Sequence, residues 1–74
     1  MNLTPGEKEM TRRIQKDPQK YLKLCNDLRG ASWCQKEQDQ LSICLNMHPN
    51  QPEKCIEYMR LVIVCNKNRG VVVD

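Results

Sequence analysis

The sequence predicts an all-α protein built on a disulfide-stapled antiparallel helical hairpin, with one or two short helices before it. The hairpin is indicated by two cysteine pairs, Cys34 with Cys44 and Cys55 with Cys65, each separated by nine residues. Ten positions along an α-helix rise about 15 Å and return to broadly the same side, so each pair marks one helix face. The four positions are also symmetric about residues 49–50. A chain that folds back there brings Cys34 to Cys65 and Cys44 to Cys55 in one register.

The size of the chain also favours covalent staples. It has 74 residues, five cysteines, one tryptophan, two tyrosines and no phenylalanine. Below about 70–80 residues a single core rarely supplies more than about 3–5 kcal/mol, so small domains commonly add disulfides or metals. This density of cysteine therefore indicates an oxidising compartment or a metal site.

Residues 1–30 form a basic N-terminal segment that we expect to be helical. Seven Lys and Arg oppose four Asp and Glu there, while the rest of the chain is balanced, so the net charge of +3 belongs to this segment. Thr4, Pro5 and Glu7 have the pattern of an N-cap, a proline at the first helical position and a capping-box carboxylate. They predict a first helix over residues 5–16.

A second short helix is expected directly after the first. Proline disfavours the α conformation of the residue before it, so Pro18 should end the first helix, and Asp17 can cap the next one. We expect this helix to end near Arg29, where Gly30 would supply a left-handed C-terminal conformation. Its apolar face would be formed by Tyr21, Leu24, Cys25 and Leu28.

The hairpin is expected over residues 31–70. Ser32 and Gln35 form a second capping-box pattern, which predicts a helix that stops ahead of Pro49. A last helix should follow this proline and run to about Lys67. Helical periodicity places the residues of the seam between the two helices at Cys34, Leu41, Cys44, Cys55, Tyr58, Met59, Val62 and Cys65.

The two Cys-x9-Cys pairs resemble the twin Cys-x9-Cys family, also called CHCH or coiled-coil-helix-coiled-coil-helix proteins. The resemblance covers residues 32–70, about half of the chain. It implies a small protein of the mitochondrial intermembrane space, folded there through transient disulfide exchange with the import oxidoreductase. Some members of the family work instead in the matrix, on the mitochondrial ribosome.

Catalysis, cofactors and metals are all disfavoured by the sequence. It contains no Cys-x-x-Cys motif, and its single histidine, His48, falls in the predicted hairpin loop. Nine-residue spacing is a poor match for structural zinc. Some small members of the family that this chain resembles are copper chaperones for cytochrome oxidase, and these carry adjacent extra cysteines before the hairpin. Here only Cys25 stands outside the four, so a copper chaperone is a less favoured alternative. We expect Cys25 to be a buried free thiol, with a redox-active or intermolecular thiol as the alternative.

The expected location is the intermembrane space. No apolar run reaches the length of a membrane span, and the N-terminus matches neither a signal peptide nor an Arg-rich presequence. The alternative is the matrix, on the ribosome.

The function is therefore expected to lie in docking. The first hypothesis is a structural or assembly subunit of a respiratory-chain complex, held by other protein subunits. The second is a protein of the small mitoribosomal subunit, with ribosomal RNA as partner. A free assembly chaperone or a lipid-transfer partner is a third.

Apolar side chains left over from the seam, among them Ile43, Ile56 and Ile63, are expected at the surface, where basic residues would steer an acidic partner. The expected docking residues are Met10, Arg12, Arg13, Ile14, Lys16, Lys20 and, in the tail of residues 71–74, Val71, Val72 and Val73.

Overall fold

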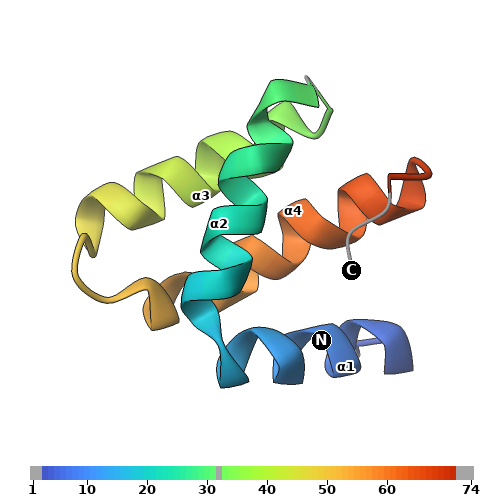
Figure 1. Cartoon of the computed structure of the whole chain (residues 1–74), viewed down its shortest axis with the longest axis horizontal. Coiled ribbons are helices and arrows are strands. Elements are labelled where there is room, and N and C mark those ends of the chain that lie inside the picture. Colours follow the sequence, from blue (N-terminus) through green and yellow to red (C-terminus); the bar gives the residue numbers. More distant parts are fainter. Residues whose placement is uncertain (1–2, 32, 72–74) are drawn as a thin grey trace.

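The computed structural model describes residues 3–31 and 33–71, and this part of the chain is all-α (Figure 1). Helices α3 and α4 form an antiparallel hairpin, α2 crosses it, and α1 lies beside α4. The elements in chain order are α1 (Pro5–Lys16), α2 (Pro18–Leu28), the 3-10 turn η1 (Arg29–Ala31), α3 (Gln35–Met47), the 3-10 turn η2 (Pro52–Cys55) and α4 (Ile56–Asn68).

The start of α1 is the capping box that the sequence predicts. The backbone N–H of Glu7 donates to Thr4 Oγ1 over 3.3 Å, and the backbone N–H of Thr4 donates to Glu7 Oε1 over 3.3 Å. These hydrogen bonds to Thr4 favour the ionised carboxylate and lower the pKa of Glu7. Two donors that helix formation leaves without partners are thereby satisfied.

Asp17 separates α1 from α2 and serves both helices. Its backbone N–H donates to the carbonyls of Arg13 and Ile14, which closes α1. Its carboxylate accepts from the backbone N–H of Lys20 over 3.2 Å, which caps α2. The predicted boundary at residues 17–18 is therefore confirmed.

The prediction for Gly30 is wrong. After Leu28 the chain tightens into η1 and Arg29 stays in the right-handed region, so no left-handed residue is used there. The glycine with a positive φ is Gly70, at 90°, just after α4. A 3-10 turn is a common alternative way to end a helix, because it satisfies the last carbonyls with shorter-range bonds.

The capping box predicted for α3 is also wrong. The helix begins at Gln35, whose Nε2 donates to Asp39 Oδ1 over 2.8 Å instead of returning to a cap. Cys34 takes the N-cap position with φ 60°, a left-handed conformation that is uncommon outside glycine. Ser32 lies outside the described residues. Because Cys34 is tied to Cys65, the disulfide and not a side-chain cap defines this helix start.

One hydrophobic core contains residues from all four helices. Its helix–helix contacts centre on α4, which packs against α3, α1 and α2. The buried apolar residues are Met10, Ile14, Tyr21, Cys25, Leu28, Leu41, Cys44, Cys55, Met59, Val62 and Ile63.

The expectation that Met10, Ile14 and Ile63 face the surface is wrong. Met10 is 6% exposed and Ile14 is fully buried, because α1 lays its apolar stripe on α4. Ile63 is fully buried in the same core, and Ile56 is partly buried against it. Only Ile43, at 61% exposure, remains at the surface as expected.

Candidate functional site

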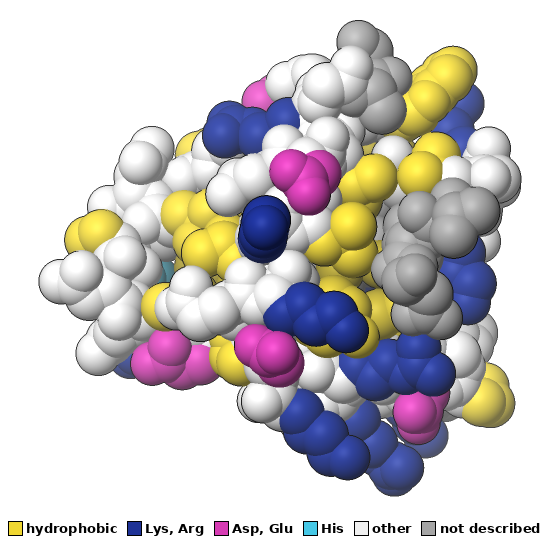
Figure 2. All heavy atoms as spheres, in the orientation of Figure 1, with side chains coloured by type: hydrophobic (Ala, Val, Ile, Leu, Met, Phe, Trp, Pro, Cys, Tyr) yellow, Lys and Arg dark blue, Asp and Glu magenta, His cyan; other side chains and the backbone are white. Residues whose placement is uncertain are grey.

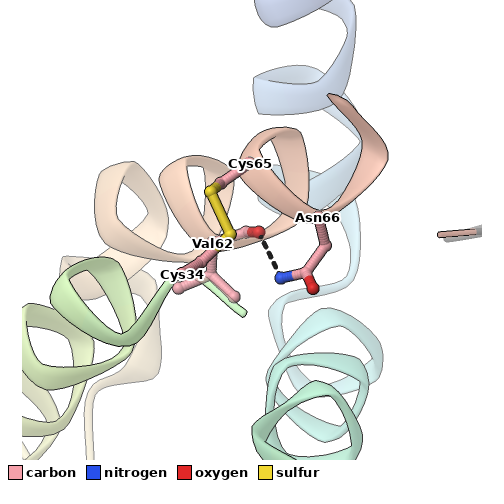
Figure 3. Close-up of a disulfide and its surroundings, with 4 residues drawn as sticks. All are labelled: Cys34, Val62, Cys65 and Asn66. Carbon is pink, nitrogen blue, oxygen red and sulfur yellow. Dashed lines mark hydrogen bonds between the residues drawn. A yellow bond between two sulfur atoms is a disulfide. The ribbon is translucent and has the colours of Figure 1, made fainter. Parts of the chain in front are cut away.

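The two predicted disulfides are both present. Cys34 and Cys65 are joined with their Cα atoms 6.2 Å apart, and Cys44 and Cys55 with their Cα atoms 6.0 Å apart. Figure 3 shows the first of these bridges, which links the start of α3 to the end of α4. We call Cys34–Cys65 the outer bridge and Cys44–Cys55 the inner bridge. The register inferred from the symmetry of the four positions is confirmed.

The two bridges differ in their exposure. Cys55 is fully buried and Cys44 is 9% exposed, so the inner bridge belongs to the core. Cys34 and Cys65 are only partly buried. Access to a sulfur atom limits thiol–disulfide exchange, so the outer bridge is the one that a soluble thiol can reach.

Cys25 is a free and fully buried thiol. Its Sγ lies 3.8 Å from the Met59 carbonyl oxygen on α4, to which it can donate. Burial raises the pKa of Cys25 to about 12. Since the thiolate is the reactive form, this environment suppresses its chemistry. The expected role of Cys25 as a small core residue therefore agrees with its surroundings.

Three buried polar residues lie in the core, two of them connect helices, and sequence reasoning missed all three. Gln38 of α3 donates through Nε2 to the Cys25 carbonyl over 3.1 Å, which ties α3 to α2. Arg60 of α4 donates through Nη1 to Thr11 Oγ1 over 3.3 Å, which ties α4 to α1. Asn66 donates to the Val62 carbonyl over 2.8 Å within α4 (Figure 3). The sequence did hold a signal for their burial, since all three occur at helical spacing from apolar residues of α3 and α4.

One group of possible metal ligands lies at the outer bridge. A carboxylate oxygen of Glu37 and the Sγ atoms of Cys34 and Cys65 are all within 4.8 Å of one another. Both sulfur atoms are committed to the disulfide, and only a thiolate is a good ligand. The oxidised protein therefore offers one carboxylate there.

The predicted basic residues form a surface over α1 and the start of α2, which we call the basic surface: Arg12, Arg13, Lys16 and Lys20. All four are exposed, and Figure 2 shows Lys and Arg side chains gathered along the lower edge of the molecule, where α1 lies. Arg13, Lys16 and Lys20 line one hollow of about 350 Å³ together with Asp17 and Tyr21. The fold thus brings together cations from two helices.

Local partners partly compensate the charge of the basic surface. Arg13 pairs with Glu9 over 3.5 Å. The Lys20 ammonium lies 5.6 Å from the centroid of the Tyr21 ring, a cation–π contact. Positive charge still exceeds negative charge in the hollow, so the basic surface remains suited to an anionic partner.

The predicted docking tail is described only at its first residue. Val71 is partly buried against the core, and its backbone N–H donates to the Asn66 carbonyl over 3.1 Å. Val72 and Val73 lie outside the described residues.

Comparison with family models, curated proteins and solved structures found no match to this chain. No helix in residues 3–31 and 33–71 combines the length and the apolar character needed to cross a membrane. The fold and the bridges define a class: small helical proteins whose antiparallel hairpin is closed by two nested disulfides. The structure is compatible with a twin-cysteine helical hairpin.

Proposed function

We propose that this chain is a twin Cys-x9-Cys protein, oxidised in the mitochondrial intermembrane space, that serves as a non-catalytic structural or assembly subunit of a respiratory-chain complex. The observation that carries the proposal is the nesting of the two bridges between antiparallel helices. Nine residues separate the cysteines of each pair, which is the pattern of that family. Disulfides form and persist in oxidising compartments and are rare in reducing ones.

The buried seam supports a folding route through an import oxidoreductase. Leu41 and Met59 are 2% and 0% exposed in the oxidised protein, and a reduced chain would present them beside its thiols. In each round of exchange, a thiolate of this chain attacks the disulfide of the oxidoreductase and forms a mixed disulfide. A second thiolate of this chain then displaces the oxidoreductase, which leaves reduced, with two electrons and two protons gained.

The basic surface supports docking on an acidic face of other protein subunits. Complementary charge steers association and sets orientation more than it sets affinity. Because Met10 and Ile14 are part of the core, the cations of the basic surface carry this role without them.

Protease protection in intact mitochondria tests the compartment and the oxidation state together. The chain should resist added protease in intact mitochondria and be digested once the outer membrane is ruptured. A thiol-alkylating reagent added under denaturing conditions should modify one cysteine per chain, Cys25. Protection that survives outer-membrane rupture would place the chain in the matrix and contradict the proposal.

Charge variants test the docking role. Arg12→Gln, Lys16→Gln and Lys20→Gln combined should lower the share of the chain that native gels find in a large assembly, with both bridges intact. The reason is that association slows when the steering charge is lost. A control with Lys36→Gln and Lys67→Gln, which are exposed cations on α3 and α4, should stay assembled. A wild-type chain that migrates only as free monomer would contradict docking and favour a soluble assembly chaperone.

A protein of the small mitoribosomal subunit is the second candidate, favoured by one feature. The hollow lined by Arg13, Lys16 and Lys20 gathers three cations from two helices, which suits the phosphates of a nucleic-acid backbone. A matrix location in the protease experiment, with salt-dependent co-sedimentation with ribosomes, would select this candidate.

A further inference from the structure

An exposed apolar groove lies at the closed end of the hairpin. One wall is formed by Ile43 and Met47, which are one turn apart on α3 and are 61% and 70% exposed. Tyr58 of α4 contributes a partly buried aromatic ring. Together they border a hollow of about 430 Å³. Large apolar side chains gathered at one exposed place usually mark an interface.

The groove is preformed by the inner bridge. Cys44 lines it, and its bond to Cys55 fixes α3 to the start of α4 directly beneath the exposed side chains. Because Cys55 is fully buried, this floor belongs to the core and not to a loop. A rigid floor lowers the entropy lost when a partner binds.

The dimensions and chemistry of the groove suit a helix. The α3 residues that line it run from Gln40 to Met47, two helical turns or about 10 Å. Amphipathic helices bind such grooves through apolar residues at positions i, i+3, i+4 and i+7. The thioether of Met47 is flexible and can adapt to the shape of such a face.

The rim of the groove carries one positive charge, that of Lys54. Lys54 lines it from η2, and the other polar lining residues are Gln40 and His48, so no carboxylate is among the described residues that line it. A partner with glutamates or aspartates beside its apolar face would therefore meet complementary charge. A two-fold contact between copies of this chain centred on the groove would instead bring two Lys54 side chains into one interface.

We propose that this groove binds an amphipathic helix of a partner protein, whose apolar face packs on Ile43, Met47 and Tyr58 and whose acidic margin lies beside Lys54. The groove would then be one of the surfaces through which the chain docks, so this proposal rests on the docking role proposed above. It does not depend on the compartment. The basic surface would steer the partner, whereas the groove would hold it.

Binding of two matched peptides to the oxidised full-length protein tests the proposal. Both are fluorescein-labelled helical peptides of 15 residues with leucines at i, i+3, i+4 and i+7. One carries glutamates beside the leucines and the other carries lysines. Fluorescence anisotropy should show the glutamate peptide binding at least tenfold more tightly than the lysine peptide.

Three variants locate the binding. Ile43→Gln with Met47→Gln should weaken binding of the glutamate peptide at least tenfold. Trp33→Gln, which alters an exposed aromatic residue at the opposite end of α3, should change it less than twofold. Lys54→Glu should remove the preference between the peptides. Unchanged disulfides and circular dichroism would show that each variant is folded.

Each other outcome overturns the proposal. Equal binding of both peptides would exclude the acidic partner, and an equal loss in Trp33→Gln would exclude this groove. Absence of binding at 1 mM peptide would exclude a helix-binding groove. Concentration-dependent dimers by light scattering, abolished by Ile43→Gln with Met47→Gln, would make the face a contact between copies of this chain. None of these results would move the chain to another compartment, so the proposed location stands or falls separately.

Discussion

Cys25 illustrates at the scale of one residue how the fold controls a thiol. Its side chain is fully buried and faces the Met59 carbonyl, and burial raises its pKa to about 12. A neutral thiol in this place behaves as a small apolar side chain. A thiolate there would have to lose its hydration, so ionisation is coupled to opening of the core.

We therefore expect iodoacetamide at pH 8 to leave Cys25 unmodified in the native protein and to modify it fully in denaturant. The sign of the pH dependence follows from the raised pKa. Below the ordinary pKa of 9.0, the neutral thiol makes its full contribution to the free energy of unfolding. This contribution is lost as the pH rises towards about 12, the pKa in the folded protein. Cys25→Ala should flatten the fall in the free energy of unfolding over that range. Rapid native labelling measured by mass spectrometry would contradict the burial.

At the scale of the elements, the first helix is part of the core and not an appendage. Ile14 of α1 is fully buried, and Arg60 of α4 donates to Thr11 of α1. Ile14→Ala should lower the free energy of unfolding by about 2–4 kcal/mol, because it leaves a cavity between α1 and α4. Gln15→Ala, at the exposed neighbouring position, should change it by less than about 0.5 kcal/mol. Chemical denaturation of the two variants gives the comparison, and equal stabilities would mean that α1 is detached.

The elements also show where sequence reasoning is strong. Thr4 and Asp17 define both ends of α1 and the start of α2 through local hydrogen bonds, so short-range signals predicted these three boundaries correctly. The start of α3 depends on the disulfide from Cys34 to Cys65, which is remote in sequence. The local capping pattern of Ser32 and Gln35 therefore gave the wrong start. Met10 and Ile14 were wrongly predicted to dock on a partner. The sequence shows that they share an apolar stripe, but it does not show whether that stripe packs on a partner or on another helix of the same chain. Of the candidate docking residues, the cations on α1 and α2 are exposed as predicted.

For the whole molecule, the bridges supply the stability that a small core lacks. The outer bridge closes a sequence separation of 31 residues, for which the chain-entropy model gives about 3–4 kcal/mol. Cys34→Ser with Cys65→Ser should therefore lower the melting temperature substantially while the inner bridge keeps α3 and α4 together. Circular dichroism of this variant and of the wild type in reductant makes the comparison. An unchanged melting temperature in both would show that packing alone is sufficient.

Non-reducing peptide mapping measures the pairing of the four hairpin cysteines directly. Trypsin places all five cysteines in separate peptides, since Lys23, Arg29, Lys36, Lys54, Arg60 and Lys67 lie around and between them. After alkylation of free thiols, mass spectrometry should find residues 30–36 joined to 61–67 and residues 37–54 joined to 55–60. The peptide of residues 24–29 should carry one alkylated cysteine, Cys25. A bridge between residues 30–36 and 37–54, or any bridge that includes Cys25, would contradict the nested hairpin.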